Sequence, residues 1–151
     1  MSDDAREDIL SALFAALQRI PDIALCERNR THRIDDDTAT AIVLHDGDLV
    51  GETDRKNAVA AGRRPVFEMT LTPTIWGYVE GSSDTVGQKI NALFKKVTDA
   101  LFHDEQFLLA LIQHDGGIGI DGAFFPTPAQ ATSPAIGVFM LEVSLPFTYV
   151  P

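Results

Sequence analysis

The spacing of hydrophobic residues along the chain predicts three helices. Over residues 4–20, apolar side chains recur every three or four positions, behind an acidic start and ahead of Pro21. That pattern is typical of an amphipathic helix whose first turns complement the helix dipole. The same repeat returns over residues 83–102 and, more briefly, over residues 104–112. Thr85-Val86-Gly87-Gln88 resembles a capping box at the start of the second helix.

Strands are predicted where apolar and polar residues alternate or where β-branched residues cluster. A Pro-rich turn over residues 126–134 separates the last two. The predicted strands cover Ile23–Arg28, Thr40–Leu44, Pro65–Val79, Gly117–Phe125 and Ala135–Val150.

The strand over residues 65–79 has the clearest alternation. Phe67, Met69 and Leu71 share one face, and glutamate and threonine side chains occupy the other. Pro73 has no N–H group to donate to a neighbouring strand. We therefore expect this segment to be an edge strand or to carry a bulge near Pro73.

Residues 46–64 have no hydrophobic periodicity and are predicted to form a long, mobile loop. The sequence His45-Asp46-Gly47-Asp48 reads as a turn that ends the preceding strand. Long loops inside compact domains are usually functional, so partner contacts are expected here. The candidate interface charges are Arg55, Lys56, Arg63 and Arg64.

The predicted order of elements is α-β-β-β-α-α-β-β, within a single domain over residues 1–151. Without regular alternation of strand and helix, a wholly parallel sheet is disfavoured. The expected fold is α+β, with a mixed, largely antiparallel sheet and two main helices packed on one face.

Charge is distributed unevenly along the chain. The formal net charge is −10, and no lysine or arginine follows Lys96. An acidic surface repels phosphate backbones, so sequence-specific nucleic-acid binding is not expected. No stretch approaches the roughly 18 apolar residues of a membrane span. The apolar, weakly negative final third is better suited to protein contact.

Three histidines precede aspartates, at His45-Asp46, His103-Asp104 and His114-Asp115. Such pairs ligate metals in His-Asp phosphohydrolases, a family built from helices. Here the aspartates stand at predicted turns and at a helix start, where Asp has ordinary structural roles. The structural interpretation is therefore favoured over a metal site.

Other candidate chemistry is also weak. Asp35-Asp36-Asp37 lacks the ligand spacing of a calcium loop and is interpreted as a solvated segment. Cys26 lies in an apolar segment and is interpreted as a core or edge-strand residue, although Arg28 is close in sequence. The glycine-rich run over residues 116–122 enters a predicted strand, whereas a phosphate cradle enters a helix. No catalytic residue, metal or cofactor is predicted.

The order of elements resembles that of a known protein family. An acidic helix over Arg6–Leu17 precedes a strand ending at Arg28-Asn29-Arg30, and a second strand ends at Asp46-Gly47. A long strand then leads into the helix containing Ile90–Phe94, and the chain finishes on the aromatic strand Leu141–Tyr149. This arrangement resembles the tail terminator proteins of long-tailed (siphophage-type) bacteriophages over nearly the whole chain.

The resemblance implies a structural role in the virion, at the head-proximal end of the tail, after synthesis in the host cytoplasm. Tail terminators form rings, commonly homohexamers, that stop polymerisation of the tail tube and provide the docking surface for the head-side connector. The implied partners are copies of the same chain, the major tail tube protein and the head–tail connector or stopper protein. DNA is implied to pass through the lumen without specific binding. The candidate ring and sheet-edge contacts are Phe67, Met69, Leu71 and Trp76.

Three other functions are compatible with the sequence. A head–tail completion or neck protein has similar size and acidity. A metal-dependent hydrolase would use the His–Asp pairs. An adaptor would bind a peptide along an exposed strand.

Overall fold

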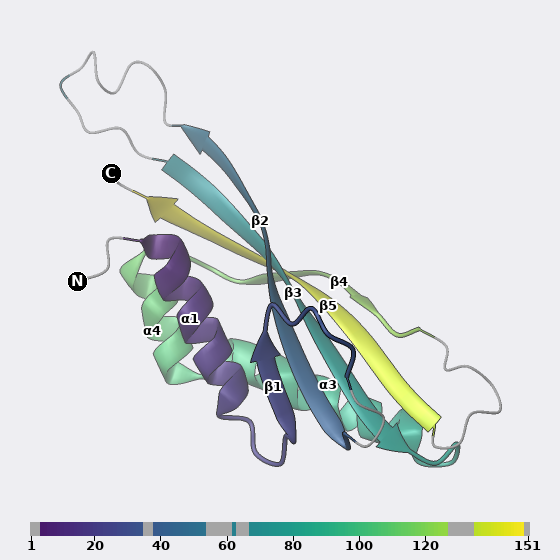
Figure 1. Cartoon of the computed structure of the whole chain (residues 1–151). Coiled ribbons are helices and arrows are strands. Elements are labelled where there is room, and N and C mark those ends of the chain that lie inside the picture. The colour runs from purple at the N-terminus through teal and green to yellow at the C-terminus, as the bar shows by residue number, and fades with distance from the viewer. Residues whose placement is uncertain (1–3, 35–37, 54–61, 63–66, 127–134, 150–151) are drawn as a thin grey trace.

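The computed structural model describes residues 4–34, 38–53, 62, 67–126 and 135–149. These residues form five strands in one sheet and three helices (Figure 1). The helices are α1 (Ala5–Gln18), α3 (Val86–His103) and α4 (Glu105–Gln113). The strands are β1 (Leu25–Arg28), β2 (Thr40–Thr53), β3 (Phe67–Gly81), β4 (Gly119–Phe124) and β5 (Ala135–Tyr149).

The strand order across the sheet is β1-β2-β3-β5-β4. Only β1 and β2 pair in parallel; the other three pairings are antiparallel. The predicted α+β class and the predicted order of elements are confirmed. No helix among the described residues is long and apolar enough to cross a membrane.

The hydrophobic core lies between the helices and one face of the sheet. Helix α3 packs against β3 and β5, and α1 packs against α4. The periodic apolar residues of the helices are the ones buried, among them Leu13, Val97 and Phe107. Gly77 leaves space for the Phe139 ring, since a Cβ on Gly77 would lie 2.2 Å from that ring. Burial of this apolar surface is the main stabilising term of the fold.

Strand β2 is longer than predicted because its centre contains a bulge where a turn was expected. Between His45 and Asp48, β2 carries one more residue than β3 does over the paired segment. Gly47 has φ +69°, the left-handed conformation of a glycine bulge. The extra residue reverses the side-chain alternation, so that Leu44 and Leu49 share the helix-facing side. Residues 48–53 therefore belong to β2, and this part of the predicted loop was wrong.

Strand β3 lies at the centre of the sheet, so the edge-strand alternative is wrong. It pairs with β2 on one side and with β5 on the other. The pairing with β5 is interrupted between Leu71 and Thr74, around the missing N–H of Pro73. The bulge alternative is confirmed in part, because the extra residue lies opposite Pro73 on β2.

Helix α3 begins without the predicted capping box. Thr85 stands at the N-cap but makes no capping hydrogen bond. Its hydroxyl instead accepts a hydrogen bond from the backbone N–H of Ser82, at 3.1 Å. The Thr85 backbone is helical, whereas an N-cap residue whose side chain caps the helix is usually extended.

The loop after β1 crosses the helix-free face of the sheet. Val43 points to this face and is nevertheless buried, beneath a segment that includes His32 and Ile34. The predicted Pro-rich turn lies outside the described residues, except for Pro126. Most of the predicted loop beyond Thr53 also lies outside them.

Candidate interaction surfaces

The four predicted interface charges lie outside the described residues. Arg55, Lys56, Arg63 and Arg64 fall in the segments 54–61 and 63–66. Their role at an interface stays a prediction.

The four predicted ring contacts lie on β3 but do not form one surface. Phe67 and Met69 are half-buried on the helix-facing side, and Leu71 on the same side is fully buried. Trp76 is half-buried on the opposite, helix-free side. Because β3 is paired on both sides at these positions, its backbone offers no open edge there. Contacts with a partner at this end of β3 would therefore be made by Phe67 and Met69.

The helix-facing side of the sheet extends beyond the helices at one end. Figure 1 shows β2, β3 and β5 projecting past the N-terminus of α1. The register places Leu49, Leu71 and Leu145 in one cross-strand row, followed by Gly51, Met69 and Phe147. The apolar face of the core therefore continues into the projecting part of the sheet.

An open groove lies where this apolar face passes the start of α1. We call it the arm groove, and it has a volume of about 500 Å³. Leu49 is 39% exposed there although the rest of its cross-strand row is buried. The lining residues are Asp4, Arg6, Leu49, Met69, Phe147 and Tyr149.

Arg6 gives the arm groove a polar group without a partner. Its Nε atom is buried and has no hydrogen-bond partner in the described part of the chain. A buried donor left unpaired costs free energy, so this N–H group destabilises the isolated subunit slightly. The groove thus combines an apolar floor with two charged residues, Asp4 and Arg6, at the start of α1.

A second exposed apolar surface lies at the opposite end of β5. Phe124 on β4 is 58% exposed, and it pairs with Met140. Phe125 follows it and packs against Phe94, with ring centroids 5.1 Å apart. Met140 and Tyr149 are separated by about 30 Å along β5, at roughly 3.3 Å per residue. The two apolar surfaces therefore occupy different ends of the sheet.

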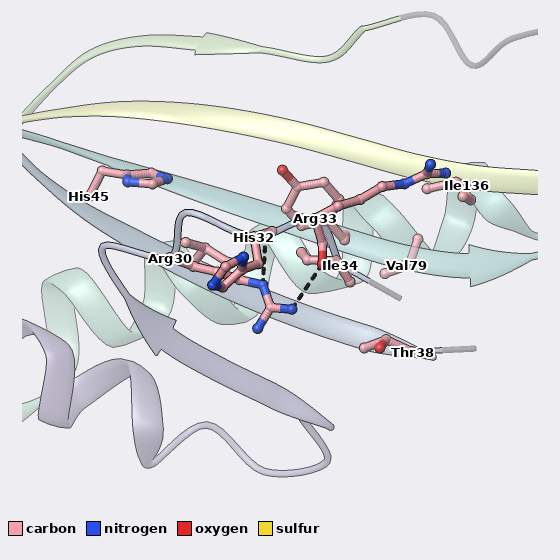
Figure 2. A pocket seen from close by; sticks show the side chains of 10 residues that line it. Arg30, His32, Arg33, Ile34, Thr38, His45, Val79 and Ile136 are labelled. Carbon is pink, nitrogen blue, oxygen red and sulfur yellow. Dashed lines mark hydrogen bonds between the residues drawn. The ribbon is translucent and has the colours of Figure 1, made fainter. Parts of the chain in front are cut away.

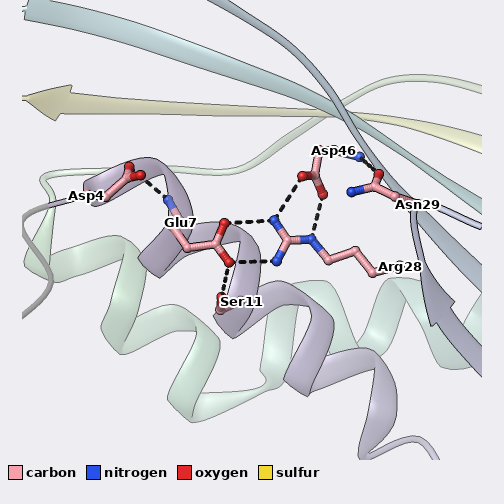
Figure 3. A network of polar contacts seen from close by, with 6 residues as sticks. All are labelled: Asp4, Glu7, Ser11, Arg28, Asn29 and Asp46. Carbon is pink, nitrogen blue, oxygen red and sulfur yellow. Dashed lines mark hydrogen bonds and ion pairs between the residues drawn. The ribbon is translucent and has the colours of Figure 1, made fainter.

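An ion-pair network fixes α1 to the sheet near the β2 bulge (Figure 3). The Arg28 guanidinium donates to both carboxylate oxygens of Asp46, at 2.7 and 2.9 Å. It also donates to both oxygens of Glu7 on α1, at 2.7 and 2.9 Å. Asn29 completes the network by accepting from the Asp46 backbone N–H at 2.9 Å. One arginine thus connects three elements that are distant in sequence.

The network shifts the acidity of its members. Hydrogen bonds from Arg28 lower the pKa of Glu7 from 4.5 to about 2, and Ser11 contributes in the same direction. The same guanidinium lowers the pKa of Asp46. Both carboxylates are therefore ionised at neutral pH. All three guanidinium nitrogens of Arg28 donate hydrogen bonds within the network.

The aspartates of the His–Asp pairs have structural roles. Asp46 belongs to the Arg28 network, and Asp104 caps α4 by accepting from the Phe107 N–H at 3.0 Å. Asp104 also receives two hydrogen bonds from Arg19, at 2.6 and 2.8 Å. Asp115 adopts φ +50° immediately after α4. These roles agree with the structural interpretation.

Candidate nucleophiles and metal ligands are not brought together. Cys26 lies on the edge strand β1 and packs against the core, and burial raises its pKa to about 11. Arg28 does not activate it, because its guanidinium turns to Glu7 and Asp46. Among the described residues, no three His, Cys, Asp or Glu side chains are grouped in a way that would hold a metal ion. The Asp35-Asp36-Asp37 run lies outside them.

The chain matches no known protein family and no curated protein sequence.

The sequence pattern did not reveal the arm groove or the Arg28 network. Leu49 was assigned to a loop because the bulge hides its alternation with Leu44. Arg6 and Arg28 gave no signal, since the surroundings of Arg6 and the partners of Arg28 depend on how α1 lies against the sheet.

Proposed function

We propose that this protein is a structural subunit that assembles with copies of itself into a ring, and that the ring is a phage tail terminator. The observation that carries the proposal is the arm groove, an apolar face of the central sheet that the described chain leaves uncovered. Leu49 and Met69 line it together with Arg6. Exposed apolar patches of this kind usually mark contacts with another protein.

The placement of the second apolar surface favours a ring over a two-fold dimer. A head-to-tail contact joins two different surfaces of the same molecule, and repetition closes a ring when the rotation allows it. The arm groove and the surface around Phe124 lie at opposite ends of β5. A neighbouring copy that placed its Phe124 end in the groove would bury both surfaces at once.

The charge of the chain supports the terminator role in particular. A net charge of −10 disfavours tight association with the DNA backbone, which suits a ring through which DNA slides. The segment over residues 46–64 also contains Arg55, Lys56, Arg63 and Arg64, which we assign to contacts with the tube protein or connector. The assignment to a tail terminator rests on the resemblance in the order of elements.

The proposal is tested by adding the protein to polymerising tail tube protein from the same phage. We expect short tubes of uniform length that carry the protein at one end, and long uncapped tubes without it. A Met69→Lys variant, which places a charge in the groove, should leave the tubes long. The proposal would be refuted if the wild-type protein left tube lengths unchanged and itself stayed monomeric.

A neck protein with similar features is distinguished by where it binds. A tail terminator contacts the last ring of the tube, whereas a neck protein binds the connector. Cryo-electron microscopy of labelled virions separates the two, because a label in contact with the connector alone would exclude the terminator assignment.

A further inference from the structure

Strand β2 has an open edge along its second half. Strand β1 covers the edge of β2 only over Ala41–Leu44. Asn29 extends this cover, since its N–H donates to the Leu44 carbonyl at 2.7 Å and its side chain accepts from the Asp46 N–H at 2.9 Å. From residue 48 to residue 53, β2 pairs with β3 alone in the described part of the chain. The backbone of this stretch is therefore available to a further strand on its outer side.

The loop after β1 also covers only the first half of β2 (Figure 2). Between this loop and the sheet lies a pocket whose β2 lining is Val43 and His45. Among the described residues, none further along β2 contributes to that lining. The covered and the open parts of β2 are thus separated by its bulge.

Strand β4 has a second open edge, on the other side of the sheet. It is the last strand in the order and, among the described residues, pairs with β5 alone over Gly119–Phe124. That pairing is interrupted by a bulge between Ile120 and Gly122. Neither residues 48–53 nor residues 119–124 contain lysine or proline, which commonly guard an exposed edge. Each copy of the chain therefore has two unlike edges that are able to accept another strand.

Two exposed apolar side chains lie at these edges, on the same face and at nearly the same level of the sheet. Leu49 shares a cross-strand row with Leu145, and Ile120 pairs with Val143. Leu145 and Val143 are both buried on the helix-facing side, so Leu49 and Ile120 also lie on that side. The two rows are about 7 Å apart along β5, at roughly 3.3 Å per residue. Ile120 is 37% exposed, much as Leu49 is, so contact between the edges would bury both side chains.

The strand directions allow the two edges to pair. Strands β2 and β5 run in the same direction because each is antiparallel to β3, and β4 runs opposite to β5. A neighbour whose sheet continues that of the first copy therefore brings its β4 antiparallel to β2. Antiparallel pairing is slightly more stable per residue than parallel pairing. A row of copies joined in this way keeps one open edge at each end, and closure into a ring removes both.

We infer that neighbouring copies are joined by antiparallel pairing of β4 in one copy with residues 48–53 of β2 in the next. This inference rests on the proposed ring and adds the backbone contact that holds it together. It places Ile120 of one copy beside Leu49 in the arm groove of the next. A two-fold dimer would instead pair β4 with the β4 of its partner, and Leu49 would stay exposed.

Cysteine cross-linking of the full chain, mixed with tail tube protein, tests this pairing. Cys26, the only cysteine, is first replaced by alanine. In this background Leu49→Cys combined with Ile120→Cys, treated with a short bismaleimide, should give a ladder of covalent oligomers up to the size of the ring. Each single variant should stay monomeric on a denaturing gel. Leu49→Cys combined with Leu109→Cys is the control and should also stay monomeric, because Leu109 is exposed on α4, outside the sheet.

The cross-linking outcomes separate this inference from the proposed function. Rings seen by mass photometry without a ladder in the first double variant would overturn the strand pairing and leave the ring in place. A protein that stays monomeric throughout would overturn both. Covalent dimers from Ile120→Cys alone would overturn the inference in favour of a two-fold contact.

A lysine on the β4 edge provides a second measurement. Ile120→Lys should lower the fraction of protein in rings by about tenfold or more, because an edge lysine opposes pairing with another strand. Leu109→Lys changes an exposed leucine outside both edges and should assemble as the wild type does. Circular dichroism checks that both variants are folded. Wild-type abundance of rings with folded Ile120→Lys would overturn the inference.

Discussion

Gly47 is the residue on which the shape of β2 depends. Its φ of +69° lies in the region that side chains disfavour, and a Cβ there would approach the Thr72 carbonyl oxygen to 2.0 Å. That oxygen belongs to the backbone of the central strand β3, so it has little freedom to move away. The bulge, and with it the burial of Leu44 on the helix-facing side, depends on glycine at this position.

We therefore expect Gly47→Ala to destabilise the fold by about 2 kcal/mol or more, from strain and steric overlap together. Gly87→Ala is the matched control, because a Cβ at Gly87 in α3 meets nothing within 4 Å. That variant should be stabilised by about 0.5–1 kcal/mol through helix propensity. Urea unfolding followed by circular dichroism measures both, and equal effects would contradict the account of the bulge.

Glu7 provides a second test at the residue scale, through the pH dependence of stability. Arg28 lowers its folded pKa from 4.5 to about 2. Ionised Glu7 therefore contributes its full stabilisation above pH 4.5, and this contribution falls as the pH drops from 4.5 towards 2. Since Glu7 is half-exposed, the contribution should be no more than about 1 kcal/mol.

Glu7→Gln should accordingly be less stable than the wild type at pH 7, and the difference should shrink between pH 4.5 and pH 3. Urea unfolding at several pH values gives the comparison. Asp99→Asn, on the exposed side of α3, should show no such change. A difference between Glu7→Gln and wild type that is constant with pH would mean that the carboxylate charge plays no part.

Among the elements, α4 shows how a short helix is held in place. Its nine residues are too few for stability in isolation, so its position depends on its contacts. Phe107 is fully buried in the core, and Asp104 both caps the helix and pairs with Arg19 after α1. The opposite side of α4 is exposed, with Leu109 57% accessible.

Truncating one buried and one exposed apolar side chain of α4 should therefore have unequal effects. Phe107→Ala should lower the free energy of unfolding by about 3–5 kcal/mol, through lost burial and the cavity left behind. Leu109→Ala, on the same helix, should change it by no more than about 0.5 kcal/mol. Thermal unfolding at neutral pH measures both. Similar losses in the two variants would contradict the packing of α4 described here.

The helices and β5 could be predicted from sequence because each keeps a single period along its length. Leu93 and Val97 follow the helical repeat of α3, and Phe139 and Leu141 follow the strand repeat of β5. Only the first part of β2, Thr40–Leu44, could be predicted, because the bulge after it changes the period within the strand. Pro73 suggested an edge strand, yet its missing N–H is accommodated at the centre of the sheet. The alternation within one strand does not show which strands pair with it on either side.

The sequence also did not show which of the predicted contact residues would be accessible. Phe67 and Met69 were predicted as contacts, and they do lie where the sheet passes the helices. Leu71, from the same alternation, is fully buried in the core. The difference depends on where α1 begins over the sheet, which the sequence of β3 does not encode.

At the scale of the whole molecule, the sheet is longer than the layer of helices that covers it. The uncovered part keeps the apolar alternation of the core and forms the arm groove beside Arg6. The second apolar surface, around Phe124, lies at the other end of β5. Two unlike surfaces on one subunit are what a head-to-tail ring requires.

Met69→Lys should therefore prevent assembly while leaving the subunit folded, because a charge buried at a contact costs several kcal/mol. Mass photometry should show rings for the wild type, alone or with tube protein, and monomers for the variant. Thr74→Lys, on the helix-free side of the same strand, tests whether any added charge has this effect. Rings of equal abundance in Met69→Lys would rule out the groove as the contact.

The most direct test of the structural role is cryo-electron microscopy of the protein mixed with its tail tube protein. We expect a closed ring of this chain on one end of each tube, with Leu49 and Met69 buried between neighbouring subunits. Bare tube ends, or a ring in which the arm groove faces solvent, would contradict it.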